Sequence, residues 1–277
     1  MTKPKNKTIS IIGCGWLGLP LAIHLQGKGF FIKGSTTSTS KIEDLKQKGI
    51  EPYLLQLQDN GTLSIEQKRN LEELLKADIL VFNIPPGRRN PDVEASFLAK
   101  IKTLRNAIEA SSLQEIIFVS ATSVYPLQNQ IVTELDAKNP SKASGKALLQ
   151  AEQVLQNLQN VETTVLRLAG LYGPNRPPGR FLAGRQNLAN GEGRVNLVHL
   201  QDCIEVIFEV IRQKKWGKTY NVCSDEHPMR EVFYTAAAKS LGLAVPTFAV
   251  NSPPKYCVVS NEKVKQELKH TFKKLEY

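Results

Sequence analysis

Three glycines near the N-terminus have the spacing of a phosphate-binding loop. Gly13, Gly15 and Gly18 form a Gly-x-Gly-x-x-Gly pattern. The first glycine of such a loop permits a tight turn, the second lets the backbone approach a pyrophosphate, and the third lets a helix pack closely on a strand. The helix N-terminus adds N–H groups and a positive dipole. We therefore expect a dinucleotide here, and we include the intervening Trp16 and Leu17 in its site.

Hydroxyl side chains follow the second apolar segment, where NAD-preferring sites usually carry an acidic residue. Ser35, Thr36 and Thr37 lie there, and the first carboxylate after them is that of Glu43. The three hydroxyls can donate to a 2′-phosphate, and Lys41 can reach it, which favours NADP over NAD. The same serine and threonine run is equally typical of a helix N-cap. We expect NADP or NAD as the cofactor, with NADP favoured.

A second set of expected cofactor contacts ends the apolar segment 79–84. Asn83, Ile84 and Pro85 come at its carboxyl end, the edge of an open parallel sheet where ligands bind. Arg88 and Arg89 follow, and they can meet an anionic group or lie on the surface without a ligand.

These residues need a scaffold, and apolar segments that alternate with amphipathic helices predict one. Strands are expected at 8–13, 30–34, 52–57, 79–84, 116–120 and 163–169, with helices at 17–27, 41–48, 92–111 and 146–158. After residue 170 come a turn-rich loop, a short helix, a strand at 195–200, a helix at 203–213, a strand at 219–224 and a helix at 230–241. The pattern is typical of an α/β fold, a Rossmann doubly wound parallel sheet. We expect a nucleotide-binding core at 1–170 and a smaller, partly interleaved substrate-binding lobe at 171–277.

Bulk composition excludes several classes of function. The formal charge is +10, but the basic residues are scattered and form no nucleic-acid-binding arm. No apolar run approaches the roughly 18 residues that span a bilayer. Four cysteines lie far apart, as is usual in a reducing compartment, and four histidines show no metal-ligand spacing. We expect a cytoplasmic protein that binds a small molecule and neither membrane, nucleic acid nor metal.

Three further motifs reveal a family resemblance. IIFVSATSVYP (116–126), LRLAGLYGPNRPPGRF (166–181) and VNLVHLQDCIEVI (195–207) follow the glycine loop in that order. Together they resemble the extended short-chain dehydrogenases/reductases, the NAD-dependent epimerase/dehydratase superfamily. The usual members have two residues between their first two glycines, so the spacing here is similar to that of the atypical YeeZ-like subgroup.

The resemblance implies three catalytic positions, and this chain has other residues at all of them. The family's serine or threonine, four residues before Tyr125, is Ala121, and counting from Glu152 its tyrosine and lysine are Ser144 and Leu148. In the family the tyrosine is the acid or base, the lysine lowers its pKa and holds the nicotinamide ribose, and the serine stabilises the reacting oxygen. Ordinary proton transfer through that pair is therefore excluded.

Nearby side chains can replace the missing groups. Thr122, Ser123, Tyr125 and Ser144 are the candidates for proton transfer, and Lys146 lies close to the last of these. Each has a structural alternative, since Tyr125 can pack behind its loop and Lys146 can be a solvated helix residue. Ser141 is a plausible N-cap of the following helix.

The loop after residue 170 carries the expected substrate contacts. Asn175, Arg176 and Arg180 lie there, and a pair of arginines suits phosphate or carboxylate recognition, although such loops are often simply basic. His199 and Asp202 resemble the family's His-x-x-Asp element, in which the aspartate caps the next helix.

Two hypotheses for the function remain open. The first is an atypical NAD(P)-binding short-chain dehydrogenase/reductase, an oxidoreductase or epimerase/dehydratase on a small or sugar-like substrate. The second is a non-catalytic NAD(P)-sensing regulatory protein. The helices at 92–111 and 146–158 correspond to the family's dimer interface, so a homodimer is possible, although their apolar residues can equally be core.

Overall fold

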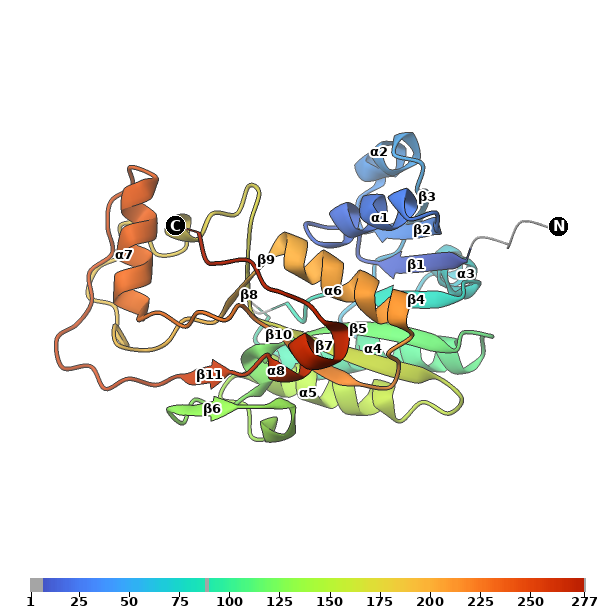
Figure 1. Ribbon diagram of the computed structural model, residues 1–277. Coiled ribbons are helices and arrows are strands. Elements are labelled where there is room, and N and C mark those ends of the chain that lie inside the picture. Colours follow the sequence, from blue (N-terminus) through green and yellow to red (C-terminus); the bar gives the residue numbers. More distant parts are fainter. Residues whose placement is uncertain (1–6, 88–89, 277) are drawn as a thin grey trace. The chain divides into compact units, whose positions relative to one another are not determined.

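The structure, a computed structural model, describes residues 7–87 and 90–276 (Figure 1). The strands of its main sheet are β1 (Thr8–Ile12), β2 (Phe31–Thr36), β3 (Glu51–Leu54), β4 (Ile79–Phe82), β5 (Glu115–Ala121), β7 (Glu162–Leu168) and β10 (Thr219–Val222). Short strands pair as β6 (Gln130–Val132) with β11 (Cys257–Val259), and β8 (Gly170–Tyr172) with β9 (Leu197–His199).

The α-helices are α1 (Gly18–Gly27), α2 (Ile42–Gln47), α3 (Ile65–Leu75), α4 (Val93–Glu109), α5 (Ala143–Gln156), α6 (Leu200–Gln213), α7 (Arg230–Ser240) and α8 (Glu262–Leu268). Short 3-10 helices are η1 (Thr39–Lys41), η2 (Thr122–Val124), η3 (Glu134–Asp136) and η4 (Pro178–Arg180).

The main sheet is parallel and doubly wound. Its strand order is β10-β7-β5-β4-β1-β2-β3, so the chain runs outward from β1 in one direction and then from β4 in the other. Ile11 of β1 pairs with Gly34 of β2 on one side and with Val81 of β4 on the other. Such a reversal of strand order leaves a crevice beyond the carboxyl ends of β1 and β4. The predicted Rossmann fold is confirmed.

The chain divides into two compact units, each assembled from separate stretches. Unit 1 comprises Met1–Ser120, Lys142–Leu166 and Ile207–Thr219. Unit 2 comprises Ala121–Ser141, Arg167–Val206 and Tyr220–Tyr277. Within unit 1, α4 and α5 pack side by side, and Phe97, Ile101, Leu104 and Ile108 of α4 are buried. Those four apolar residues therefore contribute to the core of unit 1.

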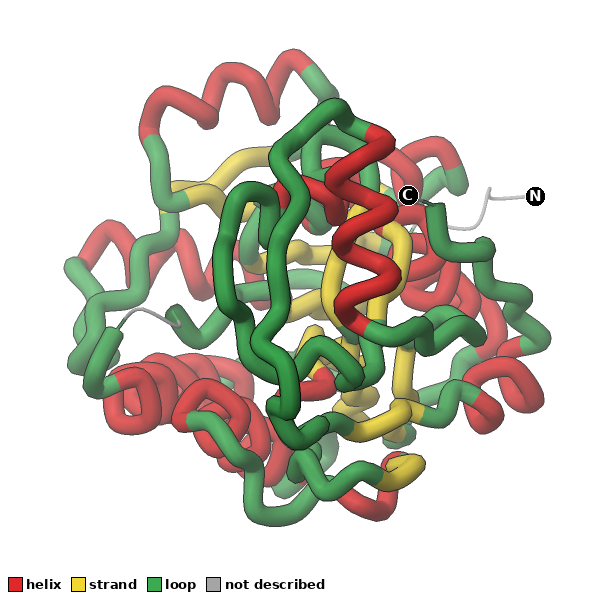
Figure 2. The backbone as a smooth tube through the Cα atoms, turned by 90° about the vertical axis from the view of Figure 1, so that its left-hand side faces the viewer, coloured by secondary structure: helices red, strands yellow, loops and turns green. Residues whose placement is uncertain are grey.

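Unit 2 contains much less regular structure than unit 1. Figure 2 shows long loops beside a helix. Within unit 2, Leu188 N–H donates to the Thr247 carbonyl at 2.9 Å. Helix α7 packs against η4, and a side chain at Gly179 would overlap the Ala237 carbonyl oxygen. All four cysteines are buried thiols. None of the helices within 7–87 and 90–276 is long and apolar enough to cross a bilayer.

Several predicted boundaries differ from the structure. Helix α5 begins at Ala143, three residues before the predicted start, and Ser141 does not cap it, because its hydroxyl accepts from Leu127 N–H at 3.4 Å. The short helix expected after the turn-rich loop is instead η4 within that loop, followed by a turn at 181–184. The strand expected at 195–200 is only Leu197–His199, because Leu200 already begins α6.

Candidate functional site

The first glycine of the loop makes the turn that ends β1. Gly13 has φ +105°, a conformation that L side chains rarely adopt, and a Cβ there would lie 2.5 Å from the Asn83 carbonyl oxygen. The Asn83 side chain donates from Nδ2 to the Gly13 carbonyl at 3.2 Å. The ends of β1 and β4 therefore lie against each other at this turn.

The third glycine brings α1 onto the same turn. Gly18 is the first residue of α1, and a Cβ on it would overlap the Gly13 carbonyl oxygen. Leu17, just before it, is buried, and Trp16 is half-buried. Only glycine allows this approach, which is the packing role that the spacing predicts for the third position.

The second glycine, by contrast, faces open space. Gly15 is exposed, and nothing lies within 4 Å of the position that its Cβ would take. A pyrophosphate could approach the backbone here, and a side chain would fill that space. The loop residues therefore fit the diphosphate of a dinucleotide.

Two of the three hydroxyls expected to bind a 2′-phosphate accept hydrogen bonds from the backbone. Ser35 is buried, and its hydroxyl accepts from Gly13 N–H at 3.0 Å, while its carbonyl accepts from Cys14 N–H at 2.8 Å. Thr36 is buried and accepts from Ser38 N–H at 3.2 Å, whereas Thr37 is exposed. Ser35 therefore stabilises the glycine loop by accepting hydrogen bonds at its hydroxyl and its carbonyl.

The residues after β4 are less buried than the strand itself. Ile84 is half-buried beside Gly13, with its Cγ1 atom 3.7 Å from the position of a Cβ there, and Pro85 is exposed. Arg88 and Arg89 lie outside the described residues.

One face of α5 carries the two positions where the family resemblance implies tyrosine and lysine. Ser144, Leu148 and Glu152 are spaced four apart and all are buried. Glu152 accepts a hydrogen bond from the Ser120 hydroxyl at 2.5 Å, which ties α5 to the end of β5. Sequence reasoning missed Ser120, although its position at the end of a buried strand could have identified it.

The remaining catalytic candidates belong to unit 2. Thr122 and Ser123 are half-buried in η2. Tyr125 is buried, donates to Asn221 Oδ1 at 2.5 Å and accepts from Arg167 Nη1 at 2.9 Å. Burial raises the pKa of Tyr125 to about 12 against the opposing effect of Arg167. Its hydroxyl is therefore protonated at neutral pH and holds a buried network together.

The expected substrate contacts are exposed in the loop after β8. A tight turn is closed by two backbone hydrogen bonds between Gly173 and Arg176, and Asn175 at its tip has φ +61°. The Arg176 guanidinium lies over the Phe181 ring at 5.8 Å from its centroid, and Arg180 is exposed in η4. Both arginines are therefore accessible to solvent.

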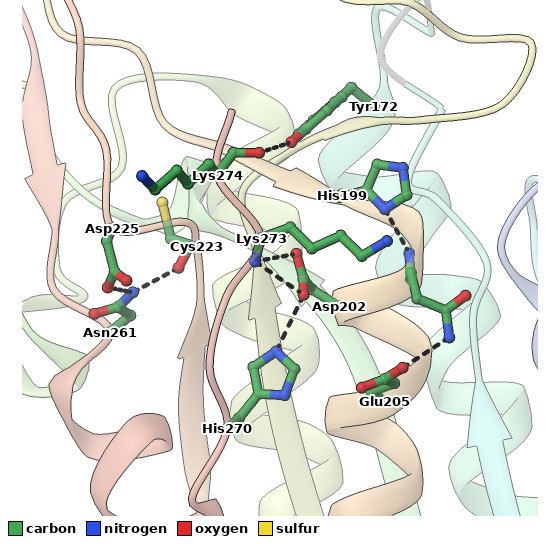
Figure 3. A network of polar contacts seen from close by, with 11 residues as sticks. Tyr172, His199, Asp202, Glu205, Cys223, Asp225, Asn261, His270, Lys273 and Lys274 are labelled. Carbon is green, nitrogen blue, oxygen red and sulfur yellow. Dashed lines mark hydrogen bonds and ion pairs between the residues drawn. The ribbon is translucent and has the colours of Figure 1, made fainter. Parts of the chain in front are cut away.

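The His-x-x-Asp element does not behave as the resemblance implies. His199 contacts the start of α6, because its Nδ1 accepts from Gln201 N–H at 3.1 Å (Figure 3). Asp202 instead contacts His270 and the backbone of Lys273 near the C-terminus. The expectation that Asp202 caps the helix is therefore wrong. Among the described residues, no His, Cys, Asp or Glu side chains gather in the groups of three that a metal ion needs.

Comparison with known proteins identifies the family. Residues 62–223, more than half of the chain, match the NAD dependent epimerase/dehydratase family. The chain is 40% identical over 242 residues to Protein YeeZ of Escherichia coli (strain K12), which covers 87% of this chain and 86% of that protein. The chain belongs to the NAD-dependent epimerase/dehydratase family. The family match begins after the glycine loop, the part whose spacing departs from that of the usual extended members.

Solved structures show the same fold. A conserved protein of unknown function from Silicibacter pomeroyi is 24% identical, covers 98% of this chain and 94% of its own, and has a TM-score of 0.72. UDP-glucuronic acid 4-epimerase from Bacillus cereus, solved with UDP-glucuronic acid and NAD, is 17% identical, covers 97% of this chain and 95% of its own, and has a TM-score of 0.76.

The network around Tyr125 makes a testable prediction. Replacing Tyr125 by Phe removes the hydrogen bonds of its buried hydroxyl to Asn221 Oδ1 and Arg167 Nη1, so Tyr125→Phe should lower the free energy of unfolding by about 1–3 kcal/mol. Urea denaturation measures this loss. Tyr256→Phe is the control, because that hydroxyl has no hydrogen-bond partner among the described residues and its loss should leave stability nearly unchanged. Unchanged stability in Tyr125→Phe would contradict the structural role.

Proposed function

We propose that this protein binds NAD through Gly13, Gly15 and Gly18 and acts as an oxidoreductase or epimerase/dehydratase on a nucleotide-sugar-like substrate. The observation that carries the proposal is the open space at Gly15 beside a turn that only glycine can make at positions 13 and 18. Trp16, Leu17, Asn83, Ile84 and Pro85 complete the proposed cofactor site. NAD, when bound, supplies a nicotinamide that accepts and returns hydride.

NAD is proposed rather than NADP. Members of the family are NAD-dependent, and the hydroxyls of Ser35 and Thr36 already accept hydrogen bonds from the backbone. Thr37 is exposed and still fits a ribose or phosphate oxygen. The preference for NADP inferred from the sequence therefore has no support from these contacts.

The proposed chemistry uses side chains that are weak acids and bases. Thr122, Ser123 and Ser144 can hydrogen-bond a substrate hydroxyl, but an unassisted hydroxyl transfers protons poorly. Leu148 supplies neither charge nor a donor to the ribose. We therefore expect slow turnover of ordinary nucleotide sugars, with Tyr125 as a structural group.

The substrate proposal rests on charge in unit 2. Asn175, Arg176 and Arg180 lie exposed on one loop, and guanidinium groups recognise phosphate well. The UDP-glucuronic acid and UDP-glucose carried by structurally similar proteins have such phosphates. Unit 2 is accordingly the proposed substrate-binding lobe.

A non-catalytic NAD sensor is the second candidate, and one observation favours it. The two positions on α5 where relatives carry tyrosine and lysine are buried serine and leucine. A protein that binds NAD without turning it over could report nucleotide occupancy to a partner.

Two further features belong to the proposal. The four buried thiols agree with a cytoplasmic location. A homodimer through α4 and α5 would use the half-buried Leu149 and Val154 of α5, since the apolar residues of α4 already pack in unit 1.

NAD binding is tested by changing the second glycine. Gly15→Asp should abolish NAD binding in titration calorimetry, because the carboxylate fills the open space and repels the pyrophosphate. Gly27→Asp is the matched control, since Gly27 also has nothing within 4 Å of its Cβ position and ends the same helix. Equal affinities for NAD in wild type and Gly15→Asp would refute the site, and tighter binding of NADP would restore the sequence preference.

Catalysis is tested by removing each hydroxyl. Thr122→Ala, Ser123→Ala and Ser144→Ala are compared with wild type by single-turnover nicotinamide absorbance with UDP-glucose and UDP-glucuronic acid. Loss of the group that moves the proton should slow turnover by about 100-fold or more. Ser112→Ala, an exposed serine of unit 1, is the control. Strong turnover in all variants would place the site elsewhere, and bound NAD without turnover would favour the sensor.

A further inference from the structure

A buried aspartate holds the C-terminal segment Lys269–Glu276 to the rest of unit 2 (Figure 3). Asp202 is 3% exposed, and its two carboxylate oxygens accept from the backbone N–H of Lys273 at 3.4 and 3.3 Å. His270 Nε2 lies 3.3 Å from the same carboxylate. Two further hydrogen bonds hold the segment, from the Tyr172 hydroxyl to the Lys274 carbonyl at 3.3 Å and from Leu275 N–H to Glu226 at 2.6 Å. The backbone at Lys273 is therefore fixed in place.

His199, three residues before Asp202, keeps one ring nitrogen available. Its Nδ1 accepts from Gln201 N–H, so the neutral ring carries its proton on Nε2. A Cβ on Gly173 would lie 3.2 Å from Nε2, and the φ of +146° at Gly173 also favours glycine. Nε2 makes no hydrogen bond to a described residue, and it is not one of the fully buried side-chain atoms that lack a partner. An N–H donor thus stands beside the loop that carries Asn175 and Arg176.

The side chain of Lys273 extends toward His199 (Figure 3). Burial and the Lys273 ammonium lower the pKa of His199, against the opposing effects of Asp202 and Glu276. His199 is therefore neutral at pH 7 and donates from Nε2. Within the described residues no carboxylate forms an ion pair with the exposed Lys273 ammonium.

We propose that Lys273 and His199 form an anion-binding pair in unit 2 that takes a phosphate or carboxylate oxygen of the substrate, with Asp202 as the positioning residue. The pair combines a cationic donor with a neutral N–H donor, and the neutral donor lies beside Gly173. The part of the inference that concerns substrate rests on the proposed function; binding of a simple anion does not.

The first experiment needs no substrate. NMR of the His199 imidazole is recorded with increasing pH and with inorganic phosphate, in wild type, Lys273→Ala and Lys274→Ala. Loss of the Lys273 ammonium should raise the pKa of His199 and weaken phosphate binding about tenfold. Lys274→Ala removes the neighbouring exposed charge and keeps the same backbone contacts, so it should change neither quantity. Equal effects of the two variants would overturn the pair.

The second experiment identifies the source of the anion. Affinities for UDP-glucose and UDP-glucuronic acid are measured by calorimetry in wild type, Lys273→Ala and His199→Gln. If the pair binds the diphosphate, both variants should bind both ligands about tenfold more weakly than wild type does. If the pair binds the sugar carboxylate, only the affinity for UDP-glucuronic acid should fall. Binding that neither variant weakens would overturn the substrate role. Failure of wild type to bind either ligand would contradict the proposed function. The phosphate titration would still test whether Lys273 and His199 bind an anion.

The positioning role of Asp202 is tested by combining Lys273→Ala with Asp202→Asn and measuring the pKa of His199. If Asp202 holds Lys273 beside His199, then Lys273→Ala should no longer shift the pKa of His199 in the Asp202→Asn background. Hydrogen exchange at the Lys273 amide should also become faster in Asp202→Asn. A pKa shift of the same size in both backgrounds would show that Asp202 only stabilises the fold.

Discussion

The contact between the Gly18 backbone and the Gly13 carbonyl is the constraint on which unit 1 depends. A side chain at either position would collide with backbone, at Gly13 with Asn83 and at Gly18 with Gly13 itself. This close approach starts α1 directly at the carboxyl end of β1. Asn83, just after β4, and Ser35, in β2, each form a hydrogen bond with the Gly13 backbone and stabilise the turn. The open side of the loop, at Gly15, is what remains for a ligand.

Helix α5 carries serine and leucine at the two positions where the family resemblance implies tyrosine and lysine. Helix α5 still lies against α4, and Glu152 still ties it to the end of β5 through Ser120. On the same face stand Ser144 and Leu148, which supply neither an activated acid nor a fixed charge. The Tyr125 hydroxyl hydrogen-bonds two buried groups, Asn221 Oδ1 and Arg167 Nη1, which gives it a structural role. This arrangement is the basis of our proposal that the protein binds NAD and has weak proton chemistry.

The sequence predicted what depends on local pattern. Buried apolar segments marked β1, β4 and β5, and glycine spacing marked the loop. The sequence could not show that Ser35 faces Gly13, because the direction of a hydroxyl at the end of a strand depends on the neighbouring strand. Short strands such as β6 and β11 were also missed, since each is stabilised only by a partner more than 100 residues away in sequence. The contact of Asp202 with the C-terminal segment is equally non-local.

The central proposal is that Ser144 and Leu148, at the positions where the family resemblance implies tyrosine and lysine, limit the chemistry. Introducing the tyrosine and lysine tests this proposal most directly. Ser144→Tyr/Leu148→Lys is compared with wild type and both single variants in single-turnover nicotinamide absorbance with NAD and UDP-glucuronic acid. Thermal unfolding checks that each variant is folded. The double variant should turn over faster than the other three proteins, because the lysine lowers the pKa of the tyrosine. Turnover by wild type as fast as that of the folded double variant would contradict the claim.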